Sequence, residues 1–110
     1  VWIVLICTVI ALQSMVVRSE TWSCSYTHED KQKVFIRVRE EGGFKNPTSE
    51  DPWVEKVLTE HDLGIHLYDT VGEFGSYFAT LLDKENKRFW KVGLTAEGPT
   101  NVIGGPCEVY

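Results

Sequence analysis

Histidines and carboxylates gather in the middle of the chain, where such groups could bind a metal ion or act as a general base. His61, Asp62 and His66 lie close together, and Asp69 and Glu73 come after them. Imidazole and carboxylate groups are zinc ligands and proton acceptors in catalysis. The spacing does not force these side chains together, because His61 falls at the end of a predicted helix and His66 on a predicted strand. We therefore predict surface histidines, no metal site and no cofactor.

No pattern of a catalytic nucleophile or a phosphate-binding loop is present. Ser76 does not form the Gly-x-Ser-x-Gly turn of hydrolases, because Tyr77 is followed by Phe78 rather than by glycine. The pairs Gly42-Gly43 and Gly104-Gly105 lack the lysine and further glycines of phosphate-binding motifs, and they predict turns. We predict that the protein is not an enzyme and has no catalytic residues.

A basic stripe runs along residues 31–39. Four basic residues lie at alternate positions on either side of Phe35: Lys31, Lys33, Arg37 and Arg39. Basic residues around an aromatic ring can bind single-stranded nucleic acid. The net charge of −5 opposes that function, so we predict no nucleic-acid partner. The stripe predicts a solvated strand face or a patch that meets an acidic protein surface.

The elements that must position these groups belong to one small domain. The chain has 110 residues, of which 43% are hydrophobic and 25% charged, an ordinary globular composition. This composition excludes a multidomain enzyme, a collagen and a disordered acidic tail.

An apolar segment precedes the domain. Residues 1–17 are almost wholly apolar, and the first charge is Arg18. Val17 and Ser19 suit the −3 and −1 positions of a signal peptidase site. We predict a signal peptide over 1–19 and a single secreted domain over 20–110, with no membrane contact after cleavage. The alternative is a membrane anchor, since the run approaches the length that spans about 30 Å of hydrocarbon.

Cysteine usage fits an extracellular protein. Cys7 lies in the apolar segment, which leaves Cys24 and Cys107 in the domain. We predict one intramolecular disulfide between them. Two free thiols, or a bond to a partner chain, are the alternatives.

The periodicity predicts one helix and several strands. Residues 33–40 alternate as a half-buried strand, and 65–70, 77–82 and 88–94 are further strands, the last two joined by a charged hairpin loop over 83–87. Asp51-Pro52 opens a helix that ends near Asp62, and Val102-Ile103 adds a short edge strand. The predicted fold is α+β: a curved antiparallel sheet of about four strands, in β-α-β-β-β order, with the short helix packed across it. A small β-barrel with a peripheral helix is the alternative.

Strand parity groups the candidate binding residues on one face of this sheet, opposite a core of Val34, Ile36, Trp90 and Val92. Aromatic residues and arginine are enriched at the centres of protein interfaces. If other segments cover this face, it becomes the wall of a ligand cavity instead, and both interpretations stay open. The candidate binding residues are Phe35, Arg37, Arg39, Tyr68 and Lys91.

The element order is similar to that of cystatin-like inhibitors of cysteine proteases. The stretch Gly75-Ser76-Tyr77-Phe78 resembles the segment after the first inhibitory hairpin of that family. The family's Gln-x-Val-x-Gly loop is absent, with Val71-Gly72-Glu73-Phe74-Gly75 in its place, so no family residue is assigned. The Gly-x-Trp opening of lipocalin-type carriers is also absent.

We predict a secreted, non-enzymatic binding or effector protein that engages or inhibits another extracellular protein. The alternatives are a carrier of a small apolar ligand and a cystatin-like protease inhibitor.

Overall fold

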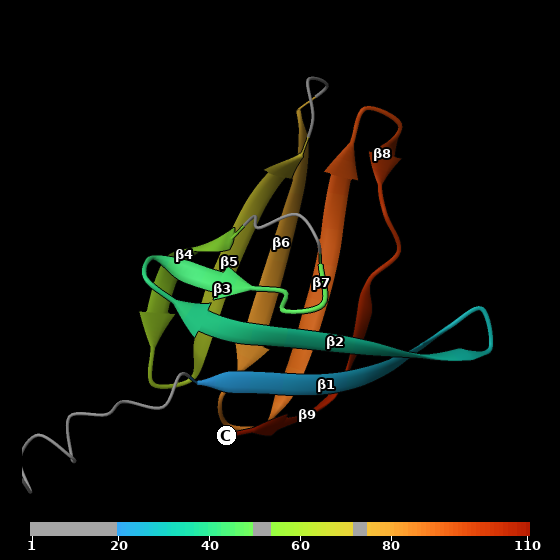
Figure 1. The fold of residues 1–110 in the computed structure, drawn as a ribbon. Coiled ribbons are helices and arrows are strands. Elements are labelled where there is room, and N and C mark those ends of the chain that lie inside the picture. Colours follow the sequence, from blue (N-terminus) through green and yellow to red (C-terminus); the bar gives the residue numbers. More distant parts are fainter. Residues whose placement is uncertain (1–19, 50–53, 72–74) are drawn as a thin grey trace, which may run out of the picture.

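The computed structural model describes residues 20–49, 54–71 and 75–110, and every regular element in these ranges is a strand (Figure 1). None of the described segments forms a helix able to cross a membrane. The strands are β1 (Thr21–His28), β2 (Lys31–Glu40), β3 (Gly43–Lys45), β4 (Val54–His61), β5 (Gly64–Val71), β6 (Ser76–Asp83), β7 (Arg88–Thr95), β8 (Gly98–Pro99) and β9 (Ile103–Val109).

The strands close into an antiparallel barrel. From β1 to β7 each strand lies beside its neighbours in the chain, and β9 lies between β7 and β1. The pairing of β6 with β7 joins the two ends of the sheet into a ring of eight strands, with β8 outside it on β7. The predicted α+β fold is therefore wrong. The alternative prediction, a small β-barrel with a peripheral helix, is right about the barrel, but the described residues contain no helix.

The predicted helix over 51–62 is the main error. Residues 51–53 lie outside the described residues, but Val54–His61 form β4, which pairs with β3 and β5. The β4–β5 register shifts between Val57 and Thr59, and Leu58 is 61% exposed there. A bulge of this kind inserts one residue and breaks the alternation of a strand. The adjacent apolar pair Val57 and Leu58 therefore imitated one face of a helix. Without that helix, the similarity to the cystatin element order no longer holds.

The longer predicted strands are present. Residues 33–40, 65–70, 77–82 and 88–94 fall within β2, β5, β6 and β7. The short edge strand expected at 102–103 is wrong in extent and position: β9 begins at Ile103, continues through Gly104 and Gly105, where a turn was predicted, and pairs with β7 and β1 on its two sides. Strand β1 was missed, because the inward Trp22 and Cys24 alternate with small polar residues in a segment that looked irregular.

The core lies on the opposite side of the strands from the predicted one. Val34 and Trp90 are 66% and 42% exposed, whereas Phe35 and Phe89 are buried and stack with ring centroids 4.2 Å apart. Both faces of β2 and β7 mix apolar and charged side chains, so alternation alone does not say which face turns inward. The buried apolar residues are Trp22, Cys24, Phe35, Phe44, Ile65, Leu67, Leu82 and Phe89.

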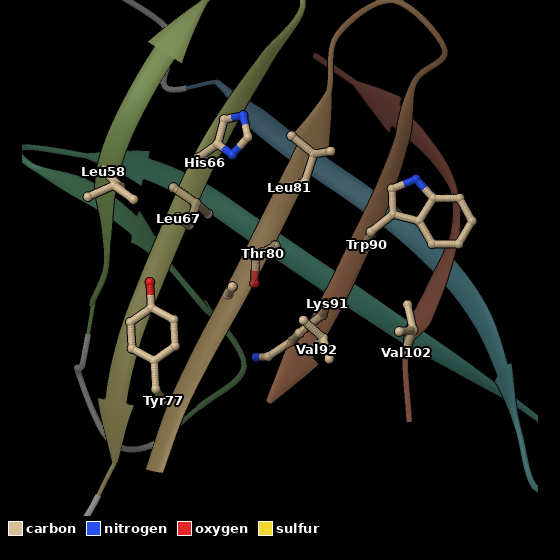
Figure 2. A pocket seen from close by; sticks show the side chains of 11 residues that line it. Leu58, His66, Leu67, Tyr77, Thr80, Leu81, Trp90, Lys91, Val92 and Val102 are labelled. Carbon is tan, nitrogen blue, oxygen red and sulfur yellow. The ribbon is translucent and has the colours of Figure 1, made fainter. Parts of the chain in front are cut away.

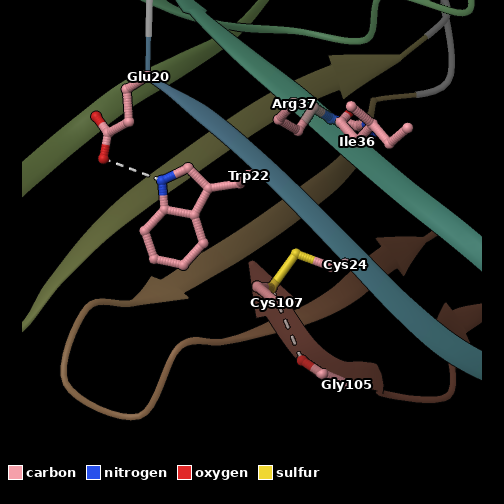
Figure 3. Close-up of a disulfide and its surroundings, with 7 residues drawn as sticks. All are labelled: Glu20, Trp22, Cys24, Ile36, Arg37, Gly105 and Cys107. Atoms are coloured by element: carbon pink, nitrogen blue, oxygen red, sulfur yellow. Dashed lines mark hydrogen bonds between the residues drawn. A yellow bond between two sulfur atoms is a disulfide. The ribbon is translucent and has the colours of Figure 1, made fainter. Parts of the chain in front are cut away.

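Strands β1 and β9 meet over a short seam. They pair through residues 22–24 and 107–109, and Cys24 and Cys107, directly opposite each other, form the predicted disulfide (Figure 3). Beside this bond, a Cβ atom on Gly105 would lie 1.8 Å from the Ser25 carbonyl oxygen, so only glycine allows the two strands to approach so closely. A disulfide is typical of chains that fold in an oxidising compartment.

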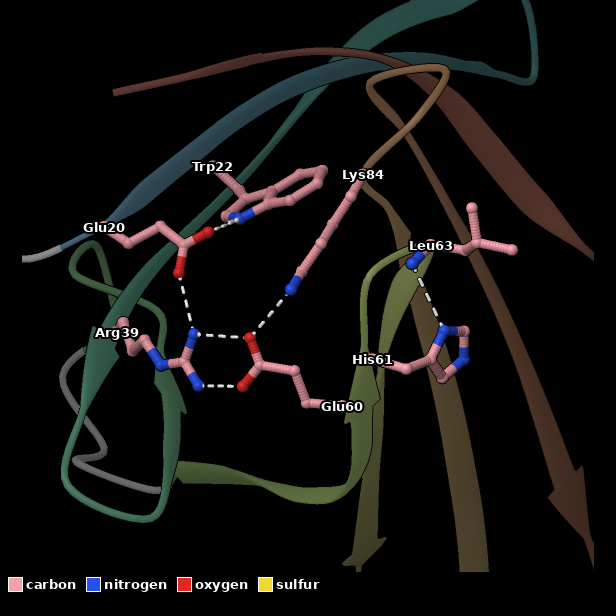
Figure 4. A network of polar contacts seen from close by, with 7 residues as sticks. All are labelled: Glu20, Trp22, Arg39, Glu60, His61, Leu63 and Lys84. Carbon is pink, nitrogen blue, oxygen red and sulfur yellow. Dashed lines mark hydrogen bonds and ion pairs between the residues drawn. The ribbon is translucent and has the colours of Figure 1, made fainter.

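A charged network closes the rim at which β1 begins (Figure 4). Both terminal nitrogens of Arg39 donate to Glu60, and Arg39 Nη1 also donates to Glu20. Lys84 donates to Glu60 at 3.0 Å, and the Trp22 indole donates to Glu20 at 3.1 Å. The hydrogen bonds from Arg39, with a smaller contribution from Lys84, lower the pKa of Glu60 to about 2.

This lowered pKa predicts that Glu60 stabilises the barrel in a pH-dependent way. Because the folded-state pKa lies below the ordinary value of 4.5, the contribution is present above pH 4.5 and is lost as the pH falls toward about 2. A Glu60→Gln variant should melt below the wild type at neutral pH, and the difference in Tm should shrink across this window. The control is Glu97→Gln, at an exposed turn position. A Tm difference that stays constant from pH 7 to pH 2 would contradict the assignment.

Candidate functional site

A group of charged side chains lies inside the barrel. Arg37 Nε donates to Glu55 Oε1 at 2.6 Å, and their side chains are only 8% and 4% exposed. The Thr80 hydroxyl donates to Glu55 Oε2 at 3.0 Å, so both oxygens of this carboxylate are bonded. Lys91 Nζ lies 3.7 Å from Glu55 Oε1. Buried charges are tolerated when they are paired and hydrogen-bonded in this way.

The alternation of the strands brings these residues together. Arg37 follows the inward Phe35 on β2, and Lys91 follows the inward Phe89 on β7, each two residues along its strand. Glu55 lies on β4 at an inward position, directly opposite the buried Phe44 of β3. The inner face of β2 and that of β7 each carry an aromatic residue, which packs in the apolar core, and two positions further a basic residue, which belongs to the charged group.

Asp69 and Lys91 are the less completely paired members of the group. Asp69 follows the inward Leu67 on β5, and burial, together with the nearby Glu55 carboxylate, raises its pKa. Its Oδ2 atom is shielded from solvent and has no hydrogen-bond partner among the described residues. Burial lowers the pKa of Lys91, although the attraction of Glu55 partly opposes this shift.

Aromatic rings border the charged group. The Arg37 guanidinium lies 4.0 Å from the centroid of the Phe35 ring. Lys91 Nζ lies 5.8 Å from the Phe35 centroid and 5.5 Å from that of Phe78. The negative faces of such rings attract cations.

A cavity of about 260 Å³ reaches Lys91 from the side of the barrel. It lies beyond the short β1–β9 seam, between His28 at the end of β1 and Ile103 at the start of β9. Its wall combines apolar side chains, polar side chains and one lysine. The lining residues are His28, Phe78, Lys91, Gly93, Thr100, Asn101 and Ile103. A larger hollow beside the disulfide, of about 330 Å³, is lined by Ser23, Ser25, Val34, Pro106, Glu108 and the two cysteines, and it does not reach the interior charges.

The outer face of β5, β6 and β7 is apolar. Cross-strand partners His66, Leu81 and Trp90 form one row, and Figure 2 shows them on the same side of the sheet. Leu58 and Val102 flank this row and are each 61% exposed. A hollow of about 170 Å³ lies among these side chains. Exposed apolar patches are typical of protein-interaction sites.

The structure divides the five predicted binding residues among three places. Phe35, Arg37 and Lys91 do lie together, but inside the barrel rather than on a surface. Arg39 belongs to the network at the rim. Tyr68 lies on the outer face, because the buried Leu67 fixes the opposite parity for β5.

Sequence reasoning missed Glu55, Thr80 and Phe78, and it considered Asp69 only as a surface carboxylate near the histidines. Glu55 fell within the predicted helix, and its spacing of two residues from Val57 is the signal that could have placed both side chains on the inner face of a strand. The ring centroids of His61 and His66 lie 5.6 Å apart on the exterior. In the part of the chain that the structure describes, no group of three or more metal-ligating side chains is present.

Comparisons with known protein families, with curated proteins and with solved structures found no match to this chain.

Proposed function

We propose that the protein is a secreted carrier that binds a small molecule inside its barrel. The observation that carries this proposal is the cavity of about 260 Å³ that leads to Lys91 and Phe78. The interior of an eight-stranded barrel is just wide enough to be filled by side chains or to hold one small ligand. The disulfide and the apolar segment at residues 1–17 support secretion.

The two ends of the interior are built differently, which favours a ligand at one of them. The cross-strand row of Ile65, Leu82 and Phe89 is completely buried. The next row contains Thr80 and Lys91, and it borders the cavity. An apolar pocket with a few convergent polar groups is the usual form of a small-molecule site. At the level of architecture alone, this arrangement is like that of lipocalin-type carriers.

Native mass spectrometry tests the proposal. The purified protein is measured natively and after denaturation, before and after incubation with a panel of small organic acids, amines and amino acids. We expect a small adduct that disappears on denaturation. No adduct under any of these conditions would overturn the proposal.

Two neighbouring residues offer a matched pair of variants for this experiment. Ile103 lines the cavity, whereas Val102 is exposed on the outer face. Ile103→Trp should fill the cavity and reduce adduct formation at least about tenfold, the loss expected when a ligand cannot seat. Val102→Trp should leave it unchanged. Circular dichroism checks that both variants are folded, and equal adduct formation in both would contradict this location for the site.

Engagement of another extracellular protein is the second candidate. The exposed side chains of Leu58, Trp90 and Val102 on the outer face favour it, since large aromatic and aliphatic groups are typical anchors of protein contacts. The surface involved would then differ from the one predicted from parity, because Arg37 is buried in an ion pair.

A further inference from the structure

Arg37 and Glu55 neutralise each other as a buried ion pair. Glu55 accepts hydrogen bonds on both oxygens. Arg37 donates from Nε to Glu55 and from Nη1 to the Ile36 carbonyl oxygen at 2.8 Å. These two charges compensate each other.

Lys91 and Asp69 are less closely paired than Arg37 and Glu55: Lys91 has the 3.7 Å contact with Glu55, and Asp69 accepts a backbone hydrogen bond from Thr70 that leaves its Oδ2 atom without a partner in the part of the chain that the structure describes. They attract each other electrostatically but form no direct ion pair, and the nearest carboxylate oxygen to Lys91, at 3.7 Å, is already bonded to Arg37. Asp69 Oδ2 is buried without a donor among the described residues. A buried oxygen without a donor is destabilising, and a ligand that supplies the donor recovers that energy.

Lys91 and Phe78 line the cavity, and Asp69 lies beside Phe78 on the neighbouring strand. Phe78 is the cross-strand partner of Asp69 on one side and of Gly93 on the other. A Cβ atom on Gly93 would lie 2.6 Å from Phe78 Cε1, so the ring leans over β7 and away from the strand that carries Asp69. The ring and Lys91 both line the cavity, and an aromatic or aliphatic ligand side chain can pack on the ring.

We propose that the barrel binds a small zwitterion of the amino-acid type, with its ammonium group at Asp69, its carboxylate at Lys91 and its side chain against Phe78. The proposal rests on the proposed carrier function and names the class of ligand. A ligand of this kind supplies a donor to the free carboxylate oxygen and an acceptor to the lysine at the same time, and the net charge of the interior stays unchanged.

Three probes with the same aromatic skeleton test the pairing by isothermal titration calorimetry: L-phenylalanine, 2-phenylethylamine and 3-phenylpropionate. The expected result is that L-phenylalanine binds at least about tenfold more tightly than either analogue, because each analogue lacks one charged hydrogen bond. Equal or tighter binding of the amine or of the acid would overturn the zwitterion assignment while the carrier function stands. Failure of all three probes also overturns it, and the native adduct measurement then decides separately whether the cavity binds ligands at all.

Two variants assign the two ends of the ligand. Asp69→Asn should weaken binding of L-phenylalanine and of the amine without affecting the acid, and Lys91→Met should weaken binding of L-phenylalanine and of the acid without affecting the amine. Asp62→Asn and Lys33→Met, at exposed positions, are the matched controls. Thermal melting identifies a variant that fails to fold, in which case the probe series with the wild-type protein still decides. Loss of all binding in both folded variants, with no selectivity between amine and acid, would contradict the assignment.

Discussion

A Glu55→Ala variant is expected to lose about 3–5 kcal/mol of unfolding free energy, the range for breaking a buried ion pair from one side. The substitution leaves the Arg37 guanidinium, whose side chain is 8% exposed, without its carboxylate. It also removes the acceptor of the Thr80 hydroxyl and the carboxylate nearest to Lys91. Urea denaturation at neutral pH measures the loss.

The double variant Arg37→Met/Glu55→Leu separates the cost of an unpaired charge from the cost of lost packing. Replacing both members of a buried ion pair by apolar residues of similar size is often neutral or stabilising. The double variant should therefore be much more stable than Glu55→Ala. If Glu55→Ala costs less than about 1 kcal/mol, the pair is not buried as the structure describes.

Removing the disulfide is the second substitution with a large expected effect. A Cys24→Ala/Cys107→Ala variant should lose about 4–5 kcal/mol of unfolding free energy. The bond joins two residues that are 83 positions apart in the sequence, and the large loop that it closes restricts the unfolded chain. Reduction of the wild-type protein should produce a loss of similar size in the same urea titration. A loss below about 1 kcal/mol in both measurements would show that the seam holds without the covalent bond.

Local patterns in the sequence were sufficient for half of the barrel. Strands β2, β5, β6 and β7 alternate clearly, and the two cysteines left in the domain pair as predicted. Strand β4 was lost to the bulge after Val57, which breaks the period of two on which strand prediction depends. Strand β1 was lost because its outward residues are small and polar, so the segment was interpreted as irregular although Trp22, Cys24 and Tyr26 face the core.

The site was predictable in part for a different reason. Parity correctly grouped Phe35, Arg37 and Lys91 on one face, but it cannot say whether that face is inside or outside. Glu55 and Asp69 meet this face only because the ring closes and brings β4 and β5 around to β2 and β7. Closure is a property of the whole sheet, and no short stretch of the sequence encodes it.

The short seam between β1 and β9 also has a consequence for the order in which the barrel forms. Hairpins such as β1–β2 and β6–β7 join residues near one another in the chain, and pairings of that kind form quickly. The seam instead joins the two ends of the described chain, so its closure carries the largest entropic cost of these pairings. Once the disulfide between Cys24 and Cys107 has formed, it holds the two ends of the domain together. The pairing of β1 with β9 then closes only a short loop, like the pairing within a hairpin.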